Sequence, residues 1–257
     1  MFKRLGHLAL VVGVLSLSGA QLWAQAATSS DDVDPDAVAT LNKMGAYLRT
    51  LKAFQVEALI TRDDVLDNGQ VVQNDEKVNL LARVPDRMRV EITSPKKHRF
   101  YFYDGKNFTI FAALANFYAI APAPDTLGKL GDDLYEKYDI ELPLQDLFLW
   151  GTPGARNGDI TSAFDVGPSE VGGVTCEQYA FRERGLDWQI WIQLGDYPLP
   201  RKLVLSTLTD EARPQYSSTL NWNLAPSFDE EAFVFDPPKD AQKIVIAKAN
   251  TSGGDSK

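Results

Sequence analysis

The sequence predicts an α+β fold, in which antiparallel strands form a sheet and helices lie on one side of it. Three observations lead to this class. Apolar residues first recur at helical spacing, then a period of two continues through many short segments, and a second helical stretch interrupts these strands at residues 125–151. Helices inserted between two runs of strands joined by short turns are typical of α+β domains.

The start of the chain predicts export. Lys3 and Arg4 give a positive beginning, an apolar stretch extends from Leu8 to Leu17, and Ala24-Gln25-Ala26 has the small-x-small pattern of a signal-peptidase site. The apolar stretch is short for a membrane span of about 20 residues, which favours a cleaved signal peptide (residues 1–26) over a membrane anchor. Since no cysteine ends this leader, we expect a periplasmic protein that is soluble and not lipidated.

Removal of the leader makes an acidic chain more acidic. The formal charge moves from −9 to −11, because the leader contains Lys3 and Arg4 and no acidic residue. This balance argues against nucleic acid as a partner and against electrostatic adsorption to anionic lipid. Cys176 is the sole cysteine, so no internal disulfide can form, and its place in a predicted strand favours a buried core residue over a reactive thiol.

A helix is predicted directly after a flexible leader of residues 27–34. Asp34 is a suitable N-cap, Pro35 suits the first helical position, and the helical spacing ends near Lys52. The residues that recur on one side of this helix are Val38, Leu41, Met44, Leu48 and Leu51.

Short segments with a period of two predict an antiparallel meander of roughly eleven strands. Asp67-Asn68-Gly69 is a strong hairpin signal between the first two of them. The first run comprises residues 53–66, 70–84, 86–94, 98–105, 106–113 and 116–124. The second run comprises residues 159–171, 174–183, 187–195, 201–210 and 215–226, after which a short acidic turn leads to residues 241–248.

The helical stretch between the two runs divides into two parts. Leu127, Leu130, Leu134 and Tyr138 form one apolar stripe, and Pro143 is expected to start a second short helix that carries Leu144, Leu147, Phe148 and Trp150. We expect residues 35–247 to form a single domain. The Gly/Ser-rich residues 248–257 are expected to be a disordered tail.

Motifs for catalysis and metal binding are sparse in this sequence. His98 is the only histidine after the leader, and it begins a predicted strand, where a solvent-facing polar side chain is the favoured interpretation. Ser94-Pro95-Lys96-Lys97 matches the Ser-x-x-Lys pattern, but it lies in a predicted turn instead of opening a helix. We therefore expect no catalytic residues, no metal site and no cofactor, and a protein that is not an enzyme.

Aromatic residues are the abundant feature. In Phe100–Phe111, "FYFYDGKNFTIF", Phe100 and Phe102 occupy one phase of a strand and Tyr101 and Tyr103 the other, whereas a half-buried strand alternates apolar with polar residues. The segment Trp188–Leu194 also carries large apolar residues on both phases. These rings either fill a core or line a binding cavity, and they suit a curved sheet that is covered on both faces.

The layout of these elements resembles the LolA/LolB-like superfamily, the lipoprotein carriers and receptors of the bacterial envelope. More closely, the chain resembles an uncharacterised family of predicted periplasmic proteins within it. This resemblance implies an incomplete antiparallel β-barrel whose concave face is apolar and is plugged by helices, and which in the carriers receives acyl chains. The segments that carry it are residues 103–111, 118–127, 142–147, 198–205 and 220–238.

We therefore predict a non-enzymatic carrier or binding protein for a hydrophobic ligand, a lipid or a lipoprotein acyl chain, held in the half-barrel between the sheet and the 125–151 helices. The alternative is an envelope sensor or protein-interaction module with a membrane partner, reached through a strand edge or through the basic turn at Lys96–Arg99. The residues predicted to line the cavity are Phe100, Phe102, Phe108, Ile110, Trp150, Trp188 and Ile190.

Overall fold

The structure is a computed structural model that describes residues 33–155 and 157–248. The predicted signal peptide, most of the 27–34 leader and nearly all of the 248–257 tail lie outside the described residues. The described residues all belong to one compact unit.

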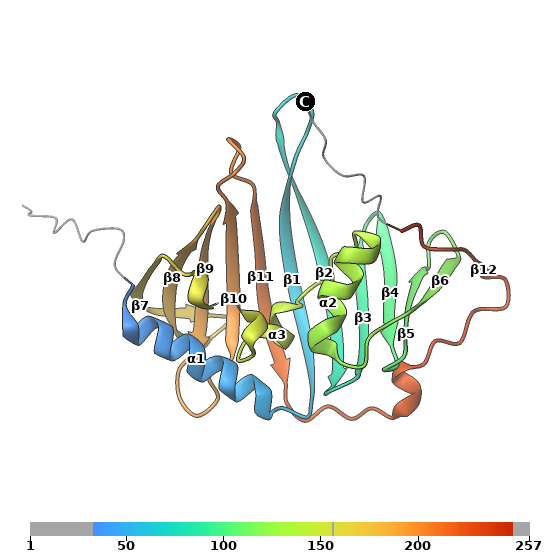
Figure 1. Cartoon of the computed structure of the whole chain (residues 1–257), viewed down its shortest axis with the longest axis horizontal. Helices are drawn as coiled ribbons and strands as arrows, with labels where there is room; N and C mark the ends of the chain where they lie inside the picture. The colour runs from blue at the N-terminus through green and yellow to red at the C-terminus, as the bar shows by residue number, and fades with distance from the viewer. Residues whose placement is uncertain (1–32, 156, 249–257) are drawn as a thin grey trace, which may run out of the picture. The chain divides into compact units, whose positions relative to one another are not determined.

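Twelve strands form one open sheet in the order β12-β6-β5-β4-β3-β2-β1-β11-β10-β9-β8-β7 (Figure 1). Eleven of them are antiparallel to their neighbours, as the period of two predicted. The strands are β1 (Ala53–Val65), β2 (Val71–Arg83), β3 (Arg87–Ser94), β4 (Lys97–Tyr103), β5 (Asn107–Ala112), β6 (Phe117–Pro122), β7 (Ser162–Val171), β8 (Val174–Glu183), β9 (Leu186–Gln193), β10 (Pro200–Thr207), β11 (Gln215–Asn223) and β12 (Gln242–Lys243).

Two meanders, β1–β6 and β7–β11, meet where β1 pairs with β11, so that Glu57 lies opposite Asn221. Residues 241–248, which follow the acidic turn, pair with the sheet only briefly. Only Gln242 and Lys243 pair, and they run parallel to Phe117 and Tyr118 of β6. The proline and acidic residues before this segment allow only a brief approach to the sheet edge.

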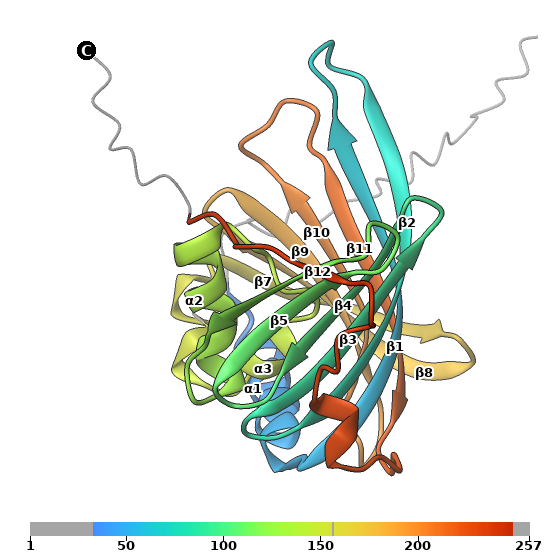
Figure 2. The same ribbon diagram turned by 90° about the vertical axis from the view of Figure 1, so that its right-hand side faces the viewer.

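The helices are α1 (Pro35–Thr50), α2 (Leu127–Tyr138) and α3 (Asp146–Leu149), with short 3₁₀ turns at Pro153–Ala155, Asn157–Asp159 and Glu230–Phe233. Figures 1 and 2 show that α1, α2 and α3 lie on the same side of the curved sheet. We call this side the inner face and the opposite side the outer face. The predicted α+β class, a curved antiparallel sheet with helices on one side, is confirmed.

Helix α1 begins as its sequence predicts. The Asp34 carboxylate accepts a hydrogen bond from the Asp36 amide at 2.8 Å, and Pro35 occupies the first turn, where its missing N–H costs nothing. The side that is buried consists of Ala37, Leu41, Met44, Gly45 and Leu48. Within residues 33–155 and 157–248 no helix is both long enough and apolar enough to cross a membrane.

The strands bury alternate residues on the inner face. In β3, Met88, Val90 and Ile92 are at most 4% exposed, and the residues between them lie on the outer face. Register then places Tyr103 opposite Met88 and Tyr101 opposite Val90, so both tyrosines of β4 belong to the inner face. The tight turn after β4 is made by Gly105, whose φ of 85° suits glycine.

Candidate ligand-binding site

The inner face is an apolar surface that extends across most of the sheet. It is apolar because strand alternation places one set of large side chains against the helices, and together they form a continuous core. Its buried members on the central strands are Phe54, Val56, Ala58, Ile60, Val78, Leu80, Met88, Val90, Ile92, Tyr101, Tyr103, Phe108, Leu203 and Leu220.

Helices α2 and α3 supply the opposing side chains. Leu127, Leu130 and Leu134 form the buried stripe of α2 that the helical spacing predicted. In α3, the Phe148 ring stacks on Phe54 with centroids 6.1 Å apart, and Phe54 in turn meets Trp222 at 5.3 Å. We call this region, between the inner face and the α2–α3 segment, the inner layer, and side chains of both surfaces interdigitate in it.

Five of the seven predicted cavity residues lie in the inner layer. Phe108 and Ile190 are fully buried, Trp188 and Trp150 are 6% and 8% exposed, and Ile110 is half-buried against the core. They come from β5, from β9 and from the end of α3. As ligand contacts they stay predictions, because no bound molecule is present.

Phe100 and Phe102 lie on the outer face instead. The register pairs Phe100 with Phe111 and Phe102 with Thr109, while their neighbours Tyr101 and Tyr103 point to the helices. Both phases of β4 are aromatic, so the sequence alone could not show which phase is inner. The signal that could have decided it is the clean alternation of β3, in which Met88, Val90 and Ile92 mark the inner phase. Inner-layer rings that the prediction omitted are Phe54, Tyr101, Tyr103, Phe148 and Trp222.

The α2–α3 segment is attached to α1 by a small set of contacts. The Arg49 guanidinium donates to the carbonyl of Phe148 at 2.8 Å and also to the carbonyl of Leu147. Beside it the two backbones touch, since a Cβ atom on Gly45 would lie 2.5 Å from the Gly151 nitrogen. Burial lowers the pKa of Arg49, so the charge of this arginine is partly desolvated. These contacts form what we call the α1–α3 latch: Arg49, Gly45, Gly151 and the two carbonyls.

Two polar groups are enclosed between α3 and the sheet. Burial raises the pKa of the Asp146 carboxyl, and the nearby Glu183 carboxylate raises it further. Burial is also the main cause that raises the pKa of Tyr216 to about 12. Asp146 is the first residue of α3, so this helix begins with a carboxyl that burial makes harder to ionise.

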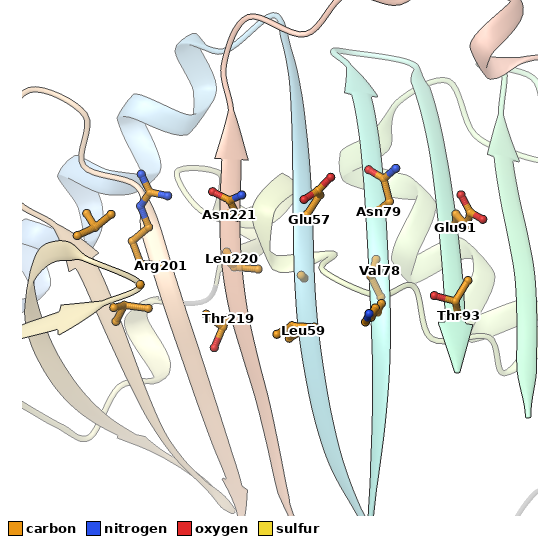
Figure 3. A pocket seen from close by; sticks show the side chains of 15 residues that line it. Glu57, Leu59, Val78, Asn79, Glu91, Thr93, Arg201, Thr219, Leu220 and Asn221 are labelled. Atoms are coloured by element: carbon orange, nitrogen blue, oxygen red, sulfur yellow. The ribbon is translucent and has the colours of Figure 1, made fainter. Parts of the chain in front are cut away.

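The outer face contains a hollow of about 760 Å³ (Figure 3). Asn221, Glu57, Asn79 and Glu91 form one row across four neighbouring strands, with Leu59 on the adjoining row. One side is closed by the end of the β7–β8 hairpin, which extends away from the helices in Figure 2. A second hollow of about 600 Å³ shares Leu59, Lys77 and Thr93 with the first, so the two form one continuous groove.

A C-terminal strap, residues 228–244, crosses the rest of the outer face. The Phe235 ring meets Phe102, Phe111 and Tyr118 with centroids 5.2 to 5.4 Å apart. Arg89 lies over the rings of Phe100 and Phe102. Phe102 is therefore covered by the chain's own C-terminal strap, and Phe100 beside it lies beneath Arg89.

The residues considered for chemistry have structural partners. His98 Nε2 lies 2.8 Å from Glu91 Oε1 on the outer face, and Lys97 forms an ion pair with Glu76. Cys176 is buried, as expected, and burial raises the pKa of its thiol. Among the described residues, His, Cys, Asp and Glu side chains nowhere gather in a group of three that could hold a metal ion.

Comparison with known proteins gives one family. A family model described as "Predicted periplasmic protein (DUF2092)" matches residues 37–247. No curated protein matches.

Several solved structures share parts of this fold at low identity. An uncharacterised conserved protein from Thermus thermophilus is 13% identical, with a TM-score of 0.46 over 79% of this chain and 97% of its own. The Mycobacterium tuberculosis lipoprotein LppX is 12% identical, with a TM-score of 0.47 over 76% of this chain and 100% of its own. A LolA superfamily protein from Nitrosomonas europaea is 10% identical, with a TM-score of 0.39 over 77% of this chain and 97% of its own.

Proposed function

Because the chain belongs to this family of predicted periplasmic proteins, we propose that it is a non-enzymatic periplasmic carrier or binding protein for a hydrophobic ligand, a lipid or a lipoprotein acyl chain. Both the family and the periplasmic location that the sequence predicted are confirmed. The ligand-binding function and the site are the proposal.

The observation that carries the proposal is an apolar inner layer closed by a segment with few polar attachments. Every methylene that a ligand buries there contributes about 0.8 kcal/mol, so a long acyl chain gains ample binding energy without catalysis. The layer is occupied by the protein's own side chains, so entry requires the α2–α3 segment to move away from the sheet. The α1–α3 latch resists this movement, together with the hydrogen bond from the Leu127 amide to the Pro85 carbonyl at 2.8 Å and the Arg62–Glu141 pair.

The Arg49→Gln variant tests this mechanism. Without the guanidinium, the carbonyls of Leu147 and Phe148 lose their charged donor, and the closed arrangement loses on the order of 1 to 3 kcal/mol. We expect uptake of the neutral fluorescent probe N-phenyl-1-naphthylamine to become faster by roughly tenfold or more. Stopped-flow fluorescence measures this rate. The matched control is Arg83→Gln, which removes an arginine that pairs with Glu230 of the C-terminal strap and should leave uptake unchanged.

Mass spectrometry of an organic extract of the purified protein provides the direct test of cargo. A lipid that co-purifies in stoichiometric amount supports the proposal. A reproducibly empty protein that also takes up no apolar probe, in wild type and in Arg49→Gln, would overturn it.

The groove on the outer face favours a second candidate, a protein-interaction module with an envelope partner. Its row of amide and carboxylate side chains offers hydrogen bonds across four strands and is not covered by helices. A photo-crosslinking residue at Leu59 or Thr219 tests this in the periplasm. One stoichiometric protein adduct together with a lipid-free inner layer would favour this candidate, and an extractable lipid without an adduct would exclude it.

A further inference from the structure

Arg99 is a cation on the apolar side of the sheet. It alternates with Tyr101 and Tyr103 along β4, and register places it between Ile92 of β3 and Ala112 of β5. These neighbours continue an apolar inner-face row through Val78 and Ala58. The residue is half-buried, so part of its side chain is shielded from solvent at this position.

The other cations at this end of the inner face have acidic partners. Lys97, two residues along β4 on the same face, pairs with Glu76, and Arg62 lies 3.7 Å from Glu141. Arg99 differs, because no carboxylate in the described part of the chain lies within ion-pair distance of it and no ring or hydrogen-bond acceptor there contacts its guanidinium. A partly desolvated guanidinium gains most from an anion that binds it through two parallel hydrogen bonds.

The inner face is partly exposed to solvent beside Arg99. Ala112 pairs with Phe117 of β6, whose side chain is 37% exposed although it belongs to the inner face. Ile110 is half-buried, whereas Tyr101 and Phe108 just beyond it are buried. The exposed ring of Phe117 and the unpaired guanidinium of Arg99 therefore lie at the solvent-facing end, and the buried side chains of the core lie beyond them.

We infer that the ligand is an acidic amphiphile, a long alkyl chain that ends in a carboxylate or a phosphate. Its anionic group pairs with Arg99 at the open end of the inner layer, and its chain extends toward Tyr101 and Phe108. This inference rests on the proposed function and narrows its ligand class.

Matched ligands test the inference. Dodecanoate and dodecanol share an alkyl chain and differ in charge, and both can displace bound N-phenyl-1-naphthylamine. We expect the wild type to bind dodecanoate about tenfold more tightly than dodecanol, since a charge-assisted pair contributes on the order of 1.5 kcal/mol. Dodecyl phosphate should behave like dodecanoate. Arg99→Gln should remove this preference while dodecanol binding stays unchanged, and Arg99→Lys should retain part of it.

The control variant is Arg89→Gln. Arg89 is a β3 arginine on the outer face, over Phe100 and Phe102, so its loss changes the net charge equally but should leave the preference intact. Thermal unfolding of each variant verifies that the fold is retained.

The outcomes separate this inference from the proposed function. If dodecanoate and dodecanol bind the wild type equally, the inference of an acidic ligand is wrong and the proposed carrier function stands. The same holds if Arg89→Gln lowers the preference for dodecanoate as much as Arg99→Gln does. If acetate or inorganic phosphate competes as well as the amphiphiles do, Arg99 is a free-anion site and the inference fails. If neither the probe nor any dodecyl ligand binds, the proposed function fails first.

Discussion

The two faces of β4 present rings of the same kind to very different coverings. On the inner face, Tyr101 and Tyr103 are 4% and 0% exposed beneath the helices. On the outer face, Phe100 and Phe102 are half-buried beneath Phe235 and Arg89. Aromatic residues on both phases of a strand therefore mark two separate coverings here, a layer of helices on one side and a single strap on the other. Each covering can be disturbed alone.

The largest effect is expected from Gly45→Ala in the inner covering. The added Cβ would lie 2.5 Å from the Gly151 nitrogen, a backbone atom that cannot move aside cheaply. We expect a loss of about 2 to 4 kcal/mol in the free energy of unfolding, measured by urea denaturation.

The matched control for Gly45→Ala is Gly128→Ala in α2, where the nearest atom to the new Cβ is 3.9 Å away. There the same change should stabilise by up to about 1 kcal/mol, because alanine favours the helix. Equal stability of the two variants would contradict the close approach of α1 and α3.

A smaller effect is expected from Phe235→Ala in the outer covering. The variant removes three ring contacts from a half-buried site, so we expect a loss of roughly 1 to 2 kcal/mol and faster tryptic cleavage at Lys239 and Lys243. Probe uptake into the inner layer should stay at the wild-type rate. If uptake changed as much as in Arg49→Gln, the two coverings would not be independent.

The smallest effect is a gain, from Asp146→Asn at the start of α3. Burial and Glu183 raise the pKa of Asp146 in the folded protein, so the folded state binds this proton more tightly than the unfolded state does. The contribution to stability is therefore present at low pH and is lost as pH rises through the folded pKa.

Asp146→Asn removes that loss, so it should stabilise by roughly 1 kcal/mol at neutral pH and have little effect below about pH 4. Thermal unfolding at the two pH values measures it. A variant that is less stable than wild type at neutral pH would show that the carboxylate is favoured there.

Much of the fold could be predicted because its local signals agree with one another. Asp34-Pro35 marks the start of α1, glycines mark the hairpin turns, and the Leu127–Leu130–Leu134 stripe marks the buried side of α2. The parallel pairing of Gln242 and Lys243 with β6 was not predicted, because pairing with a sheet edge depends on tertiary contacts that a short apolar run does not encode.

The candidate site was harder to predict, because strand phase is a global property. Register decides that Phe108 and Ile110 meet the helices while Phe100 and Phe102 meet the strap, and register is set by packing against distant strands. The contacts of the α1–α3 latch could not be predicted from the sequence either, because they join distant segments. Arg49 and Phe148 are 99 positions apart, and nothing local relates them.

The seam between β1 and β11 has a kinetic consequence. Every other antiparallel pair in the sheet joins strands that are consecutive in the chain, so the loop between them is short. The β1–β11 pair instead joins residues that are far apart in the sequence, such as Glu57 and Asn221. Non-local pairing of this kind requires a long loop to close, and the conformational entropy lost on closure is not offset until the strands pair. This cost slows folding. The two meanders can each form early from local hairpins, but the half-barrel forms only after β11 has paired with β1. The order of synthesis therefore delays the inner layer until nearly the whole chain is available.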